Sequence, residues 1–191
     1  MLTFLGRLAQ RSVERGSPFT NVLGLARSLL ALSSLSTLLF SHTSSLFLPM
    51  SGRETPHCSG AGAYGLYCLL PADKLELGRW LSVLVLLVVA SGYRPRITAP
   101  LHAYVTFSFL SNASMLDGGD QLVSNLSLFL LVPSLLDPRR WHWDAPAQVS
   151  PERILVARSA VLFVRLQMCA VYLQAGVAKF AVREWVDGTV L

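Results

Sequence analysis

The strongest structural signal in the chain is ILVARSAVLFVRLQMCAVYLQAGVAKFAVREWVDGTVL, residues Ile154 to Leu191. Residues 154–180 are mostly apolar. At about 1.5 Å of rise per residue they form a helix longer than the hydrocarbon core of a bilayer, which is about 30 Å thick. This stretch therefore predicts a membrane-spanning helix.

Composition supports the same class for the whole chain. Hydrophobic residues make up 52% of the 191 residues, charged residues 14%, and the mean hydropathy is +0.49. A soluble domain has about 25% charged residues. We therefore expect an all-α, polytopic membrane bundle of about five transmembrane helices. The net charge of +5 is scattered between apolar segments, a pattern typical of membrane topology rather than of nucleic-acid binding.

Four polar residues recur every seventh position in the last span: Arg158, Arg165, Tyr172 and Lys179. Seven residues are nearly two helical turns, so these side chains share one slowly drifting face. A charge at the bilayer centre costs about 2.5–3.5 kcal/mol, so the face is expected to meet protein or a wet cavity. Alternatively, the residues near the two helix ends reach the headgroups, although this does not account for Arg165 at mid-helix.

Earlier apolar segments predict four further spans. Their expected bounds are Val22–Phe40, about 74–93, about 98–115 and 122–136. Asn21 is expected to cap the first, and Asp73 with Glu76 has the spacing of a capping box for the second. Pro100 is expected near the start of the third, and Pro133 near a break in the fourth. Ser150 and Pro151 predict the start of the last span.

Several single residues have open interpretations. Arg27 lies early in the first span and either reaches the cytoplasmic headgroups or contacts the inside of the bundle. His102 is expected at the interface. Cys169 is expected to be a small core residue.

The loop 41–73 carries Cys58 and Cys68. If the loop is extracytoplasmic, a disulfide would close a small glycine-rich ring. The alternatives are free thiols, or a metal site formed with His57 and His42. We take the disulfide as the first prediction and expect no metal.

Loop charges predict the orientation. Residues 1–21 contain Arg7, Arg11 and Arg15 and are expected to form a basic amphipathic leader on the cytoplasmic surface. The connections 94–97 and 137–153 are also basic, whereas 41–73 and 116–121 have one basic residue or none. Alternate connections are thus basic, which predicts a multi-pass protein of the cell membrane with a cytoplasmic amino terminus.

Two stretches resemble known membrane proteins. NVLGLARSLLALSSLSTLLF, Asn21 to Phe40, resembles the opening of the SdpB family of the bacterial sporulation-delaying toxin system. YLQAGVAKFAVREWVDGTVL, Tyr172 to Leu191, resembles the signature of the HTTM superfamily, which includes vitamin K-dependent gamma-carboxylase. SdpB relatives usually continue for further helices. The resemblance therefore implies that residues 22–191 are an HTTM-like transmembrane domain, with three alternatives for its length: a member shortened at the C-terminus, a fragment, or a frame-interrupted gene product.

The resemblance implies a function in maturing or producing a secreted antimicrobial peptide, a bacteriocin-like toxin. The implied partners are the toxin precursor peptide, a small SdpA-like protein and the lipid bilayer. One alternative is a quinone-dependent carboxylase or oxygenase-like enzyme, in which Lys179 would be the base, as the similarly placed lysine of the carboxylase is. Arg158, Arg165 and Tyr172 would then face the anionic substrate. The other alternative is a non-catalytic membrane scaffold.

Overall fold

The computed structural model describes residues 6–7, 10–11, 13–14, 16–49, 55–146 and 148–189. Apart from one isolated bridge between Tyr93 and Trp141, the regular structure of these residues is helical. The elements are α2 (Asn21–Phe40), α3 (Thr43–Leu46), η1 (Gly60–Tyr64), α4 (Leu66–Leu69), η2 (Ala72–Lys74), α5 (Leu75–Ser91), α6 (Pro95–Asn112), α7 (Gly118–Leu136), α8 (Pro151–Phe180) and α9 (Arg183–Val186). The predicted all-α class is confirmed.

Among the residues that the structure describes, three helices are long and apolar enough to cross a membrane: α2, α7 and α8. α5 has 17 residues, and α6 has 18 residues that include Arg96, His102 and several hydroxyl side chains. The expected total of five spans therefore remains a prediction.

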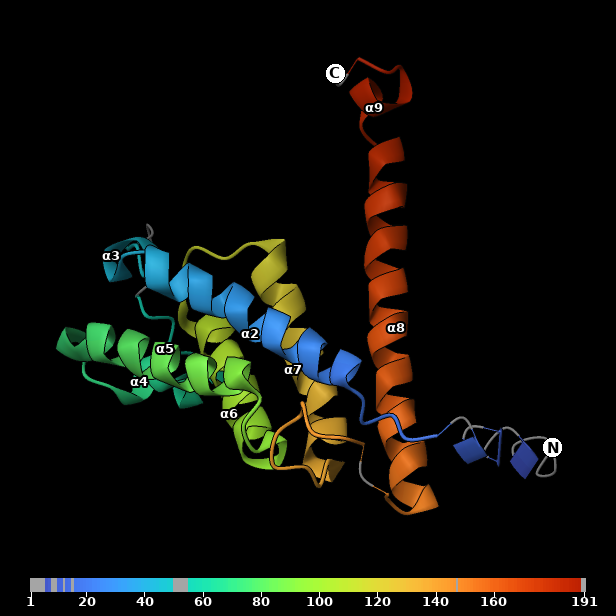
Figure 1. Ribbon diagram of the computed structural model, residues 1–191. Helices are drawn as coiled ribbons and strands as arrows, with labels where there is room; N and C mark the ends of the chain where they lie inside the picture. Colours follow the sequence, from blue (N-terminus) through green and yellow to red (C-terminus); the bar gives the residue numbers. More distant parts are fainter. Residues whose placement is uncertain are drawn as a thin grey trace.

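α2 and α5 lie side by side, and α6 packs against α7 (Figure 1). The apolar faces of α2, α5 and α6 form one core together with side chains of the loop between α2 and α5. Its largest fully buried side chain, Tyr67, comes from α4 in the loop and tilts against Phe47 with 4.7 Å between ring centroids. α8 packs on α7 through Ile154, Ala157 and Ala160. Phe163 also stacks on Phe129 of α7, with 6.2 Å between ring centroids. Further along, α8 rises away from the bundle as a single long helix (Figure 1).

The connections between helices gather at two opposite ends of the bundle. At one end the main-chain N–H of His142 donates to the carbonyl of Gly92 at 3.0 Å. At the other end, the N–H of Ser114 donates to Leu46 at 2.9 Å, and the N–H of His57 donates to Asn112 at 3.0 Å. The basic connections 94–97 and 137–153 thus lie together at one end of the bundle. Loop 41–73 and the turn after α6 lie at the other end. Which end faces the cytoplasm stays a prediction, as does the leader, part of which, including Arg15, lies outside the described residues.

Two predicted helix caps are wrong. The N-cap position of α2 is Thr20 instead of Asn21, and that of α5 is Lys74, so Asp73 and Glu76 form no capping box. Neither N-cap side chain accepts a hydrogen bond from the helix. The reason at α5 is that the Glu76 carboxylate pairs with Arg79 and accepts from the hydroxyl of Thr43. Arg79 is itself buried and donates to the carbonyl of Leu38 at 2.6 Å, which joins α5 to the end of α2.

Three predictions about proline and glycine positions are also wrong. α6 begins at Pro95, where a missing N–H costs nothing, and Pro100 lies inside the helix. Pro133 is fully buried, and α7 continues past it to Leu136. The glycine-rich turn 116–121 is in fact the first turn of α7, where Asp117 and Asp120 form a capping box.

Candidate functional site

An open groove of about 780 Å³ runs between α2, α7 and α8, near the point where the start of α2 meets α8 (Figure 1). Its walls are mainly aliphatic, formed by Val22, Leu23, Ala26, Leu29, Leu30, Val123, Leu126, Leu130, Val161 and Val164. Its polar lining comes from Ser17, Thr20, Ser33, Arg158 and Arg165. The lining contains no Asp or Glu, so the charge of the groove is positive.

The two arginines of the groove are held differently. The Nη2 of Arg158 donates to the carbonyl of Gly16 at 2.7 Å, while its Nε is buried with no partner in the described structure. Arg165, two turns further along α8, is exposed on the groove and has no acceptor among the described residues. An anion that entered the groove would therefore find free guanidinium donors.

The predicted face of α8 divides into two parts. Arg158 and Arg165 line the groove, as a shared helical face requires. Tyr172 and Lys179 lie further along α8 and are exposed, outside the groove. The Nζ of Lys179 lies 4.3 Å from the ring centroid of Trp185. Its assignment as a base remains a prediction. Cys169, also on this half of α8, is exposed, so its expected place in a core is wrong.

Arg27, the arginine of the first predicted span, lies inside the bundle. Arg27 is only 3% exposed, and its Nη2 donates to the hydroxyl of Thr98 on α6. Its Nε and Nη1 have no partner among the described residues. The interpretation of Arg27 as a contact inside the bundle is therefore the correct one. His102, one turn along α6 from Thr98, is also buried rather than interfacial, because it faces the inside of the same bundle.

The connection after α7 folds beneath the helix ends and supplies a second set of buried charges. Asp137 and Arg139 form a buried ion pair, with 2.8 Å between Oδ2 and Nη2 and 2.9 Å between Oδ1 and Nε. The remaining Nη1 of Arg139 donates to the carbonyl of Asp144 at 3.0 Å. Sequence reasoning took this segment for a polar surface loop and so missed the pair.

His142 packs the connection after α7 against α2 and the end of α5. Its ring fills the space that a β-carbon on Gly24 or Gly92 would occupy, at 2.7 Å and 2.2 Å from the nearest ring atoms. Its Nε2 lies 3.3 Å from the hydroxyl of Ser28. Burial, followed by the nearby charges of Arg27 and Arg139, lowers the pKa of His142 to about 4. The two glycines were the signal that could have pointed to this packing.

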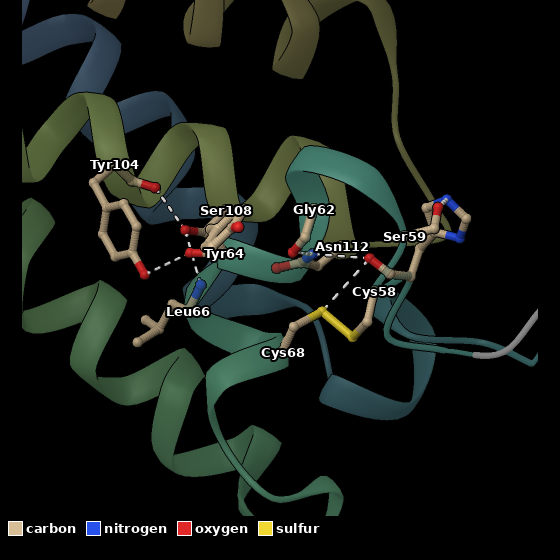
Figure 2. Close-up of a disulfide and its surroundings, with 10 residues drawn as sticks. Cys58, Ser59, Gly62, Tyr64, Leu66, Cys68, Tyr104, Ser108 and Asn112 are labelled. Carbon is tan, nitrogen blue, oxygen red and sulfur yellow. Dashed lines mark hydrogen bonds between the residues drawn. A yellow bond between two sulfur atoms is a disulfide. The ribbon is translucent and has the colours of Figure 1, made fainter.

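At the opposite end, Cys58 and Cys68 are joined by a disulfide, with 5.6 Å between their Cα atoms (Figure 2). The buried side chain of Asn112 donates to the carbonyls of His57 and Gly62 at 2.9 and 2.8 Å. The hydroxyl of Tyr104 donates to Tyr64, and that of Ser108 accepts from Leu66 (Figure 2). The loop is thus bound to α6 through side chains that sequence reasoning did not single out.

Metal ligands do not gather in this loop. Within the described ranges, no group of three His, Cys, Asp or Glu side chains is placed to hold a metal ion. Cys58 and Cys68 bond to each other instead of offering thiolates. The ring nitrogen Nε2 of His57 lies 2.8 Å from the hydroxyl of Ser59.

The fold and the groove define the class as an all-helical, membrane-associated protein. Its sequence is similar to two proteins of Bacillus subtilis strain 168. Uncharacterized protein YitO is 40% identical over 195 aligned residues, which cover 99% of this chain and 62% of YitO. Sporulation-delaying protein SdpB is 31% identical over 186 residues, which cover 94% of this chain and 56% of SdpB.

The comparisons support an SdpB-like relationship. The chain spans about three fifths of the length of the curated relatives it matches. No family model matches the chain, and no solved structure does. Membership of the HTTM superfamily therefore stays a prediction.

Proposed function

We propose that this protein is an SdpB-like membrane component needed to mature or produce a secreted antimicrobial peptide. The observation that carries the proposal is the similarity to SdpB, which extends over 94% of this chain. Because the aligned region covers 94% of this chain, the relationship involves most of the fold and not one motif. A toxin precursor peptide and an SdpA-like protein are the partners that the proposal requires.

The structure adds properties that suit such a role. Buried polar contacts hold both ends of the bundle, through His142 at one end and Asn112 at the other. A membrane protein that positions a peptide partner needs a rigid support of this kind.

The test is mass spectrometry of the peptides secreted by the strain that encodes this protein, with the gene intact, deleted and restored. We expect a small secreted peptide that loses its mature mass, or disappears, on deletion and returns on complementation. A second culture should carry the precursor gene under an independent promoter, so that a loss of transcription is excluded. Identical peptide profiles in all three strains would refute the proposal.

The described residues do not bring Lys179 together with the two arginines in one site, as the quinone-using alternative requires. Lys179 lies about 21 Å from Arg165 at helical rise and outside the groove. The scaffold alternative is compatible with the fold, but it gives no reason for the free guanidinium groups in the groove. Neither alternative has an observation of its own in its favour.

A further inference from the structure

We propose that the groove between α2, α7 and α8 binds one anionic phospholipid, with the lipid phosphate at Arg158 and Arg165 and an acyl chain along the aliphatic walls. The proposal concerns binding only. It is independent of the toxin role, since either could fail without the other.

The first step in the argument is where the groove lies. The three helices that border it are the three that are long and apolar enough to cross a membrane. Large apolar side chains on these helices are exposed, including Leu29, Leu128 and Phe163. In a bilayer such surfaces meet lipid chains, so a phospholipid is the molecule that surrounds the groove.

The second step is the shape and chemistry of the walls. A volume of about 780 Å³ falls within the usual range for small-molecule sites, about 300–1,000 Å³. The walls are aliphatic, and beyond the first turn of α2 their backbone groups are bonded within helices. An extended peptide would therefore find few free main-chain donors and acceptors there, whereas an acyl chain needs none.

The third step is charge. Arg165 has no acceptor in the described chain, and the buried Nε of Arg158 has none either. A single arginine at membrane depth costs about 2.5–3.5 kcal/mol unless it finds an anion or water. Guanidinium groups bind phosphate through paired, charge-assisted hydrogen bonds. With no Asp or Glu in the lining, a phosphate has no competing carboxylate in the groove.

The test is native mass spectrometry of the detergent-purified full chain, titrated with phosphatidylglycerol or phosphatidylcholine of the same acyl chains. We expect one phosphatidylglycerol to be retained with a preference of about tenfold or more, since charge-assisted bonds contribute that much. The double variant Arg158→Gln/Arg165→Gln should lose the preference. Arg183→Gln is the matched control and should keep it, because Arg183 is exposed in α9, away from the groove.

One further variant and one further measurement distinguish the remaining outcomes. Val164→Trp narrows the groove without changing charge and should weaken retention of both lipids. If the arginine variants misfold, the wild-type preference should still fall at high ionic strength, because salt screens the charges. Equal retention of both lipids by the wild-type protein would overturn the proposal. So would full competition by inorganic phosphate, which would indicate a free-anion site, or displacement of the lipid by a precursor peptide.

Discussion

The main-chain N–H of Arg94 donates to the carbonyl oxygen of Arg140 at 2.7 Å. This hydrogen bond joins two basic connections that are separated by α6 and α7. The ring of Tyr93 packs beside Trp141 at the same place, with 5.0 Å between centroids. The contact puts both connections on one side of any membrane that the bundle crosses, which is what their charge predicts.

Topology can be tested by cysteine labelling. With Cys169 replaced by serine, Ala72→Cys and Ala145→Cys place single reactive thiols in exposed positions at opposite ends of the bundle. We expect a thiol reagent that cannot cross the membrane to label Ala72→Cys from outside the cell. The same reagent should label Ala145→Cys only when it is given access to the cytoplasm. Arg53→Cys, in the part of the loop outside the described residues, should behave like Ala72→Cys. Labelling of both ends from the same side would contradict the orientation.

Cys58 and Cys68 should be oxidised to each other in protein extracted from membranes. A ring of this size should stabilise the fold by roughly 2–3 kcal/mol in the chain-entropy model. Replacing both cysteines by serine should therefore lower the thermal midpoint, with the Cys169→Ser variant as the control. Intact-mass analysis that found both thiols free would refute the pairing.

Gly92→Ala should be among the most damaging single-methyl changes in the chain. Gly92 has a φ of +85°, and a β-carbon there would lie 2.2 Å from Nε2 of His142. The left-handed backbone and the overpacking together should cost about 2–5 kcal/mol. Gly118→Ala is the control, because no atom lies within 4 Å of its β-carbon position. Equal thermal midpoints for the two variants would show that His142 does not occupy this position.

His142 should make the protein sensitive to mild acid. Its pKa is about 4 in the fold and near 6.5 in the unfolded chain, so the unfolded state binds the proton more readily. The contribution of the neutral ring is complete above pH 6.5 and is lost as the pH falls toward 4. The free energy of unfolding should then decrease by up to about 1.4 kcal/mol per pH unit.

The variant His142→Phe keeps an aromatic ring in this position and should flatten that part of the pH profile. His42→Asn, in an exposed position, serves as the control and should leave the profile unchanged. An unaltered slope in His142→Phe would assign the acid sensitivity to another group.

Lys179 can be tested as a base by conservative substitution. Arginine keeps the charge and the contact with Trp185 but cannot act as a base near neutral pH. If Lys179 is a base, both Lys179→Arg and Lys179→Ala should abolish peptide maturation at normal protein abundance. Full activity in Lys179→Arg would remove the base assignment and leave a role as an anchor.

The sequence alone was enough to predict the all-helical class, the start of α8 at Ser150 and Pro151, and the placement of Arg158 and Arg165 on one helical face. These features depend on local signals, namely apolar length, proline at a first helical position and helical periodicity. Predictions from local signals were wrong where another side chain takes the hydrogen-bonding group that the signal depends on. Glu76 has the spacing of a cap, but the guanidinium of Arg79 takes its carboxylate.

Only the tertiary structure decided which polar residues are buried. Nothing near Arg27 or His142 in the sequence shows that Thr98 and Ser28 will meet them, because those partners are 71 and 114 residues away. Burial of a polar group is tolerated when another element supplies its hydrogen bonds, and this depends on how helices pack rather than on the composition of one helix. For the same reason periodicity placed Lys179 and Arg158 on one face, whereas packing of α8 on α7 brought only the arginine into the groove.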